Sequence, residues 1–473
     1  MNLISSPGRP LQGVMCVPGD KSLSHRAALF AALAEGESRI ENFLVSGVTQ
    51  AMLQALSALG VEWAWEADKQ GHPQGVLVVQ GRGLGGLRSP AAILDCGNSA
   101  TTMRMLAGAL SASMAGALSA SMAGALSASM AGALSAAGVT ATLDGSAGLR
   151  RRPMNRIVEP LQQMGVDIQA SGGCAPLTLR PTPFPLRPLN YTLPVASAQI
   201  KTCLLLAALA ADGTTSLVEP GPSRDHSERM LRSMGVTITA EKSYSDGKPL
   251  YKTSLTPPKG RVLAPLAMAL PGDFSSAAFL IVAAVITPAS NVTIQGVGLN
   301  SARTGLLDAL LGMGADICIT AQADRSGEPV GDLIIKYSRL HGTNICGEQV
   351  VRMIDEFPIF AIAAAYADGT TTVSEAAELR LKESDRIGVL CEELGKLGVQ
   401  ATEHPDGFTI HGGAPVQGGV LEPHGDHRLA MSLAVAGLAS QAPVTIQDAR
   451  IIEESYPEFT QTLQSLGGRL VVE

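Results

Sequence analysis

A short sequence piece recurs six times along this 473-residue chain and constrains its fold more than any other feature. Each copy is typical of the end of a leucine-rich helix, followed by a glycine and the start of a β-strand. Glycine commonly follows a helix C-terminus, because that position often needs a left-handed backbone conformation. The copies are LSALGVEW (56–63), LQQMGVDI (161–168), LRSMGVTI (231–238), LLGMGADI (310–317), LGKLGVQA (394–401) and LQSLGGRL (463–470).

A second piece also recurs six times and predicts an Ala/Leu-rich helix opened by small polar or charged residues. Most copies lead into a turn and a β-prone run. Because several of these helices are apolar nearly all round, we expect them to be buried against sheets. Each repeat is then predicted to contain, in chain order, a helix, a strand, a polar loop, an amphipathic helix and a second strand. This order predicts an α/β protein. The helix starts fall near Ser22, Asn98, Ser197, Ser275, Asp355 and Asp426.

Six units of this size need about two hydrophobic cores, so we expect two lobes of three repeats each. The Pro- and Lys-containing stretch 254–271, between the third and fourth repeats, suits a crossover. We therefore expect one lobe to contain residues 1–17 and 270–473, with both termini. Residues 18–269 would form the second lobe.

One stretch, 107–137, departs from the repeat. The octet AGALSASM occurs three times from Ala107 and begins a fourth copy at Ala131. No charge occurs between Arg104 and Asp144, so a membrane span is one alternative. Two serines and a glycine in every octet, without flanking basic asymmetry, favour a longer helix or a helical hairpin outside the core. Sequence slippage without a function explains the expansion better than a new activity does.

The overall composition narrows the class of protein. A net charge of -7 argues against a general nucleic-acid surface, so bound anions would need local basic clusters. Seven scattered cysteines without a CxxC pair indicate free thiols in a reducing compartment. The spacing of His25, His226 and His427 does not suit a metal site. The N-terminus shows no secretory signal pattern, so we expect a cytoplasmic protein.

The openings of the repeated helices carry most of the unusual polar residues, including Lys21, Arg104, Lys201 and Arg428. A helix N-terminus offers unpaired N–H groups and a positive dipole end, so it is a natural phosphate or carboxylate site. For any single start, simple capping by Ser, Asp or Asn is the better explanation. Basic residues at several equivalent starts favour anion binding in one place. The order of Gly19 and Lys21 does not fit a nucleotide-binding P-loop.

Several of these blocks resemble the signature blocks of the 5-enolpyruvylshikimate-3-phosphate synthase family, and the resemblance runs almost end to end outside the octets. It implies a two-lobed inverse α/β barrel. It also implies transfer of the enolpyruvyl group of phosphoenolpyruvate to the 5-hydroxyl of shikimate 3-phosphate in the cleft between lobes, with release of phosphate, as in chorismate and aromatic amino acid biosynthesis. The blocks are PGDKS (18–22) with SHR (24–26), GNSAT (97–101) with Arg104, Arg152-Pro153, SAQ (197–199), RLKESDR (380–386) and DHR (426–428).

The resemblance also implies roles for individual residues. Asp355 would accept the proton of the attacking hydroxyl, Glu383 would donate a proton to the enolpyruvyl methylene, and Lys21 would complete the catalytic set. The phosphoenolpyruvate site would comprise Lys21, Ala100, Arg104, Arg152, Gln199, Arg386 and Arg428. The shikimate 3-phosphate site would comprise Lys21, Ser22, Arg26, Ser197, Ala198, Gln199, Ser223, Asp355 and Lys382.

The same resemblance implies no cofactor, no metal, no nucleic-acid or membrane partner, and a monomer. Alanine at position 100, where many members have glycine, is similar to the glyphosate-insensitive class and implies glyphosate tolerance. Without the resemblance, Asp355 and Glu383 would be interpreted as a helix cap and a surface charge.

Two alternative functions compete with the one that this resemblance implies. The enolpyruvyl transferase acting on UDP-N-acetylglucosamine shares the fold and the chemistry, but it commonly has a cysteine in the loop corresponding to 145–152, where this chain has none. The KESDR block at 382–386 also favours the shikimate reading. The second alternative is a repeat-built binding scaffold, or an enzyme inactivated by the octet expansion.

Overall fold

The computed structural model describes residues 1–67, 75–122, 140–182, 185–245 and 247–473. These residues form two compact units, one of Met1–Asp20 with Pro271–Glu473 and the other of Lys21–Leu270. We call them the terminal unit and the central unit. Each has its own hydrophobic core, and the chain passes between them after Asp20 and after Leu270.

Three four-stranded sheets make up the described strands of the central unit. In each, the first two strands are parallel and the last two are added antiparallel. The first sheet has the order β14 (Ala267–Ala269), β3 (Glu35–Glu41), β5 (Val76–Arg82), β4 (Glu62–Glu66). The second has β6 (Leu94–Asp95), β7 (Ala141–Asp144), β9 (Cys174–Arg180), β8 (Asp167–Ser171). The third has β10 (Asn190–Thr192), β11 (Thr215–Glu219), β13 (Lys248–Thr256), β12 (Thr237–Ser245).

The terminal unit repeats this pattern in three further sheets among its described strands. One has the order β2 (Gln12–Cys16), β15 (Asn291–Gly298), β17 (Glu328–Lys336), β16 (Asp316–Arg325). The next has β18 (Asn344–Ile345), β19 (Gly369–Val373), β21 (Gly407–Gly412), β20 (Gln400–His404). The last has β22 (Gly419–Leu421), β23 (Val444–Ile446), β1 (Leu3–Ser6), β24 (Arg469–Val472), so both termini share one sheet.

Each repeat contributes one buried helix and one amphipathic helix. The buried helices are α1 (Lys21–Leu33), α3 (Ala100–Met122), α6 (Ala198–Ala208), α8 (Phe274–Ile286), α11 (Phe357–Ala365) and α13 (His427–Ala436). The amphipathic helices are α2 (Gly47–Ala58), α5 (Asn155–Gln163), α7 (His226–Ser233), α9 (Gly305–Gly312), α12 (Arg386–Lys396) and α14 (Phe459–Ser465). The described residues also contain the short helix α10 (Glu348–Arg352) and the 3₁₀ segments η1 (Leu149–Arg151), η2 (Lys259–Arg261), η3 (Ala377–Leu381) and η4 (Ala449–Glu454).

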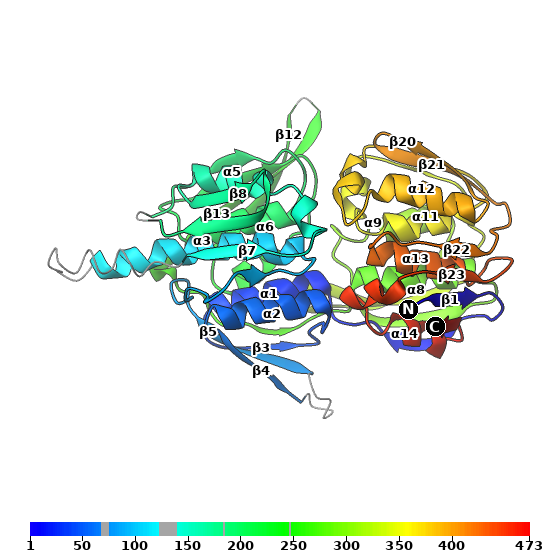
Figure 1. The fold of residues 1–473 in the computed structure, drawn as a ribbon, viewed down its shortest axis with the longest axis horizontal. Coiled ribbons are helices and arrows are strands. Elements are labelled where there is room, and N and C mark those ends of the chain that lie inside the picture. The colour runs from blue at the N-terminus through cyan, green and yellow to red at the C-terminus, as the bar shows by residue number, and fades with distance from the viewer. Residues whose placement is uncertain (68–74, 123–139, 183–184, 246) are drawn as a thin grey trace. The chain divides into compact units, whose positions relative to one another are not determined.

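Hydrophobic burial explains this arrangement. Every residue of α8 and of α11 is buried, so neither helix has a polar face and each must be covered on all sides. Figure 1 shows α1 and α2 over one face of the sheet that contains β3, β4 and β5. The sequence that makes a helix apolar therefore also fixes its inner position in the unit.

The six helix–glycine–strand pieces and the α/β class are confirmed. Each piece ends an amphipathic helix and begins a strand, and its glycine has a left-handed φ between 76° and 102°. The expected two strands per repeat were too few, since every sheet among the described residues has four. The missed strands include parallel strands of two or three residues, such as β6 and β14, which are too short to show a pattern.

The first two octets of the expansion lie in α3, which continues to Met122, and 123–139 lie outside the described residues. α3 packs very closely on α6 at Gly108, where an added Cβ would lie 2.2 Å from the carbonyl oxygen of Cys203. The buried Ser111 hydroxyl donates to the Ala107 carbonyl at 2.7 Å, so the helix itself satisfies it. In the part of the chain that the structure describes, no helix is both long and apolar enough to cross a membrane.

Candidate active site

The first group of candidate residues lies at the start of α1, in the central unit. Arg26 is buried, and its guanidinium donates to the Ser22 hydroxyl at 2.6 Å and to the Ser22 carbonyl at 3.0 Å. Its other nitrogens donate to the hydroxyls of Ser227 on α7 and Thr202 on α6. One arginine therefore fixes the Ser22 hydroxyl at the opening of α1 and ties that opening to two other helices.

His25 links the openings of α1 and α3. Its Nδ1 lies 2.8 Å from the carbonyl oxygen of Lys21, the first residue of α1, and its Nε2 lies 3.5 Å from the hydroxyl of Ser99. Burial lowers the pKa of His25 to about 4, and the positive charges of Lys21 and Arg26 act in the same direction. The ring is therefore neutral near pH 7. Because a carbonyl only accepts, Nδ1 carries the proton and Nε2 can accept from Ser99.

Residues from α3 and α6 meet in a second group. Arg104 on α3 donates to the side-chain oxygen of Gln199 at 2.5 Å and to the carbonyl of Pro153 at 3.1 Å. The amide nitrogen of Gln199 in turn donates to the Thr101 hydroxyl at 2.8 Å. Arg152, next to Pro153, is itself buried. This part of the central unit thus concentrates two arginines and an amide at helix openings, an arrangement suited to a carboxylate or phosphate.

The third group joins Ser197, which precedes α6, to Ser223 in the loop before α7. Glu219, at the end of β11, accepts from the backbone N–H of Ser197 at 3.0 Å and from the hydroxyl of Ser223 at 2.8 Å. Lys201 lies 2.8 Å from both Glu219 and Glu228. The sequence suggested that Lys201 strengthens an anion site at this helix opening. Instead, its buried ammonium group is paired within the protein.

The terminal unit contains the candidate acid–base residues. Asp355, just before α11, has one carboxylate oxygen 4.0 Å from the Lys382 ammonium nitrogen and 4.0 Å from the Arg386 guanidinium. Arg428 donates to the Asp355 backbone carbonyl at 3.2 Å and approaches its carboxylate at 3.9 Å. Glu383 pairs with Arg386 at 2.7 Å. All five residues therefore gather around the openings of α11, α12 and α13.

The pKa values of Arg386 and Lys382, two basic groups of this cluster, shift in opposite directions. Burial alone would lower the pKa of Arg386, but the carboxylates of Asp426 and Glu383 outweigh it and raise that pKa. Burial lowers the pKa of Lys382, against the opposing effect of Asp355. The cluster places two partly exposed carboxylates, Asp355 and Glu383, against cations that can also attract an anionic ligand.

Two residues outside the expected set support this cluster. Asp426 caps α13 through the Arg428 N–H at 2.9 Å and accepts from Arg386 at 2.7 Å. Glu356 accepts a short hydrogen bond from the Ser275 hydroxyl and lies 3.7 Å from Arg428. The sequence revealed Asp426 only as a helix opener, because its partner lies in a different repeat. Glu356 was likewise visible only as part of a helix opening, next to Asp355.

A further buried network surrounds Asp20, where the chain first passes from the terminal unit to the central unit. Arg303 lies 3.2 Å from the Asp20 carboxylate, donates to Asp273 at 2.5 Å and to the Ser275 hydroxyl at 2.9 Å. Gly19 and Gly272 form an isolated antiparallel bridge beside it. Arg303 therefore fixes the last residue before α1 to the opening of α8. Arg303 lies in the turn before α9 and belongs to none of the sequence motifs, so its role could not be predicted.

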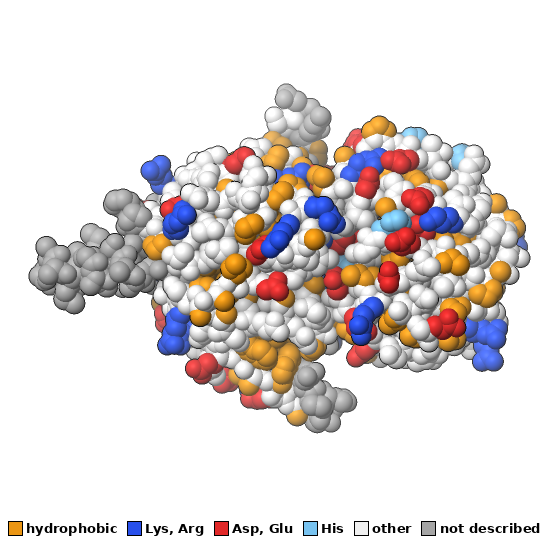
Figure 2. All heavy atoms as spheres, viewed as in Figure 1, with side chains coloured by type: hydrophobic (Ala, Val, Ile, Leu, Met, Phe, Trp, Pro, Cys, Tyr) orange, Lys and Arg blue, Asp and Glu red, His pale blue; other side chains and the backbone are white. Residues whose placement is uncertain are grey.

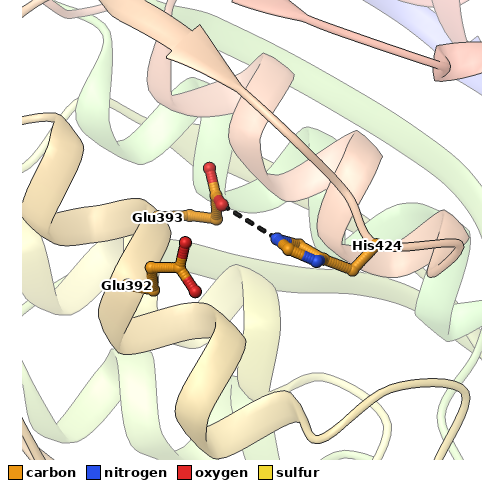
Figure 3. A group of neighbouring side chains, drawn as sticks. All are labelled: Glu392, Glu393 and His424. Atoms are coloured by element: carbon orange, nitrogen blue, oxygen red, sulfur yellow. Dashed lines mark hydrogen bonds and ion pairs between the residues drawn. The ribbon is translucent and has the colours of Figure 1, made fainter.

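The structure also contains a group with metal-ligand geometry, Glu392 and Glu393 on α12 with His424 in the loop before α13 (Figure 3). Glu393 is buried and already accepts from His424 at 3.0 Å, from the Glu422 backbone N–H at 3.0 Å and from Lys396 at 2.7 Å. A lysine at that carboxylate opposes a cation. We interpret the group as a structural tie between α12 and the loop.

Lys, Arg, Asp and Glu side chains are interspersed over the face that Figure 2 shows.

Comparisons with known proteins agree with the motifs. The family model for EPSP synthase (3-phosphoshikimate 1-carboxyvinyltransferase) matches residues 5–463. A 3-phosphoshikimate 1-carboxyvinyltransferase of Synechococcus sp. (strain JA-3-3Ab) is 43% identical and covers 98% of this chain and 96% of its own. The protein of that name from Coxiella burnetii (strain RSA 493 / Nine Mile phase I) is 40% identical, covering 99% and 97%. A solved EPSP synthase structure from Acinetobacter baumannii gives a TM-score of 0.78 at 38% identity, covering 100% of both chains.

The six-repeat fold and its cationic helix openings define an α/β enzyme of the two-domain inverse fold, acting on small anionic substrates. Within that class, the chain belongs to the EPSP synthase family, the 3-phosphoshikimate 1-carboxyvinyltransferases. Membership in this family favours a 3-phosphoshikimate 1-carboxyvinyltransferase over the two alternatives, a UDP-N-acetylglucosamine transferase and a binding scaffold.

Proposed function

We propose that the protein transfers the enolpyruvyl group of phosphoenolpyruvate to the 5-hydroxyl of shikimate 3-phosphate and releases inorganic phosphate. The observation that carries this proposal is the gathering of Asp355 and Glu383 around Arg386, beside Lys382 and Arg428. Addition of an alcohol to an enol phosphate of this kind protonates carbon while oxygen loses a proton, so two proton-transfer groups are required. Membership in the EPSP synthase family supports the choice of substrates.

Asp355 accepts the proton of the attacking 5-hydroxyl in this proposal. Three cations lie about 4 Å from its carboxylate, and such neighbours keep an acid ionised and able to act as a base. Lys382 and Lys21 hold shikimate 3-phosphate close to it. Elimination of phosphate then moves both protons in the opposite directions and restores the starting protonation states of the two carboxyl groups.

Glu383 donates the proton that reaches the methylene carbon. Its pairing with Arg386 at 2.7 Å favours the ionised form before substrate binds. An anionic substrate held by Arg386 adds negative charge next to Glu383, which favours the protonated form of that carboxyl group. Substrate binding therefore prepares the acid for the addition step.

The two substrates are held by separate sets of residues. Arginine forks suit the phosphate and carboxylate of phosphoenolpyruvate, because they donate two parallel hydrogen bonds. We assign that substrate to Lys21, Ala100, Arg104, Arg152, Gln199, Arg386 and Arg428. We assign shikimate 3-phosphate to Lys21, Ser22, Arg26, Ser197, Ala198, Gln199, Ser223, Asp355 and Lys382.

Three finer properties follow from the same proposal. Ala100 is buried at the first position of α3, and its methyl group would crowd glyphosate more than phosphoenolpyruvate, which would make the enzyme glyphosate-tolerant. The chemistry uses acids, bases and cations of the protein, so it needs no cofactor or metal. We further expect a cytoplasmic monomer.

Inorganic phosphate release tests the proposal. The protein is mixed with phosphoenolpyruvate and shikimate 3-phosphate, together and separately, and UDP-N-acetylglucosamine replaces the acceptor in a parallel reaction. Release that requires phosphoenolpyruvate and shikimate 3-phosphate together supports the proposal. Release only with UDP-N-acetylglucosamine, or no release from folded protein, would contradict it.

A further inference from the structure

A buried ion triad lies beneath two of the proposed shikimate 3-phosphate residues, in the central unit. It consists of Lys201 on α6, Glu219 at the end of β11 and Glu228 on α7, and each of the three residues is at most 3% exposed. Burial alone would lower the pKa of Lys201, but Glu228 and Glu219 outweigh it and raise that pKa. The lysine is therefore charged and is shared by two carboxylates at 2.8 Å each.

The two glutamates have different surroundings despite their equal distances to Lys201. One oxygen of Glu219 accepts from the Ser197 N–H at 3.0 Å, and its other oxygen accepts from the Ser223 hydroxyl at 2.8 Å. Glu228 makes neither bond, and its nearest hydroxyl donor is Thr253 at 3.5 Å. Of the two glutamates, Glu219 is therefore the one that connects the triad to the two serines, among the residues that the structure describes.

The bonds to Glu219 fix both serines in position. Ser197 is the N-cap residue of α6, so its N–H has no partner within the helix, and its bond to Glu219 holds the chain where it enters α6. Ser223 lies in the loop between β11 and α7, and Lys201 also donates to its carbonyl at 3.5 Å. A buried ion pair seldom adds stability over apolar packing, so the specific geometry that it imposes is its main consequence here.

We infer that Glu219, held by Lys201, is a positioning residue for the shikimate 3-phosphate site through Ser197 and Ser223. This inference rests on the proposed function. Glu219 touches no substrate in this scheme. Its effect reaches shikimate 3-phosphate through two serines whose positions it sets. The phosphoenolpyruvate residue Arg104 donates instead to Gln199 and Pro153.

Glu219→Gln and Glu228→Gln form a matched pair that tests the inference. Each removes one of the two carboxylate charges at Lys201 and leaves the lysine one ionised partner, so neither variant strands a buried charge. We expect Glu219→Gln to raise the KM for shikimate 3-phosphate about tenfold, with the KM for phosphoenolpyruvate changed less than about threefold. Glu228→Gln should change both constants less than about threefold.

Glu219→Asp separates position from charge, because it keeps the carboxylate but shortens the side chain by one methylene. It should also weaken shikimate 3-phosphate selectively, in kinetics and in direct calorimetric binding. Equal changes in the two glutamine variants, or an unchanged KM for shikimate 3-phosphate in both Glu219 variants, would overturn the inference. Wild-type protein that binds no shikimate 3-phosphate would instead overturn the proposed function on which the inference rests.

Discussion

Asp426 and Arg386 form a two-point ion pair in which Nε of the arginine lies 2.7 Å from one carboxylate oxygen and Nη2 lies 3.2 Å from the other. Both side chains are almost fully buried. The same guanidinium pairs with Glu383. Asp426 therefore holds the cation on which the proposed acid depends, and this relationship leads to the first prediction.

Asp426→Asn should destabilise the protein by about 3–5 kcal/mol and lower kcat, because it leaves a buried guanidinium without its main counter-charge. Denaturant unfolding and steady-state kinetics measure the two effects. Asp385→Asn is the control, since Asp385 also caps a helix and pairs with an arginine, but at the surface. It should cost at most about 1 kcal/mol. Equal losses in the two variants would contradict the role given to Asp426.

Gly108→Ala should destabilise the protein by about 2 kcal/mol or more. The added Cβ would lie 2.2 Å from the Cys203 carbonyl oxygen, so α3 and α6 would have to move apart. Gly395→Ala is the matched helical control, because nothing lies within 4 Å of its added Cβ. That change should stabilise α12 by up to about 1 kcal/mol. Thermal unfolding of both variants measures the contrast, and a neutral Gly108→Ala would refute the close approach.

His25 should make the protein less stable as the pH falls from about 6.5 toward about 4. Its pKa is lowered from 6.5 to about 4 in the folded protein, so in this window the unfolded state binds a proton that the folded state does not. The shift corresponds to about 3 kcal/mol at most. In His25→Asn this part of the pH dependence should be absent. Urea unfolding at pH 7.5 and pH 4.5 measures it, and parallel losses in both proteins would contradict the assignment.

Ala100→Gly should lower the glyphosate concentration for half-inhibition at least tenfold, because it removes the methyl group from the opening of α3. Inhibition is measured at fixed phosphoenolpyruvate, together with the KM for phosphoenolpyruvate. Ala27→Gly, which removes a methyl group from the buried middle of α1, serves as the control and should leave inhibition unchanged. Strong inhibition of the wild type at micromolar glyphosate and low phosphoenolpyruvate would show that Ala100 confers no tolerance.

The sequence predicts the repeat well because the repeat is local. Each helix–glycine–strand piece needs one left-handed residue next to an apolar stripe, and glycines such as Gly165 and Gly398 supply it within eight residues. The hairpin partner strands and the strands of two or three residues were not predicted, because their pairing is fixed by the sheet and not by their own composition.

Pairings between repeats limit what the sequence predicts about the site. Asp426 was visible as a helix cap, but its pairing with Arg386 depends on how two repeats pack. Lys201 looked like an anion ligand, because the local pattern cannot show that Glu219 and Glu228 enclose it. Buried polar partners come from distant segments, so they become visible only in the folded chain.

The most direct test of the central claim is single-turnover phosphate release by the wild type and by Glu383→Gln, with Glu392→Gln as the control. Glu392 is an exposed carboxylate on α12, close in sequence to Glu383. Release should require both substrates, fall at least 100-fold in Glu383→Gln, as expected when a general acid is lost, and be unchanged in Glu392→Gln. Undiminished release in Glu383→Gln would contradict the role of Glu383, and no release in the folded wild type would contradict the reaction itself.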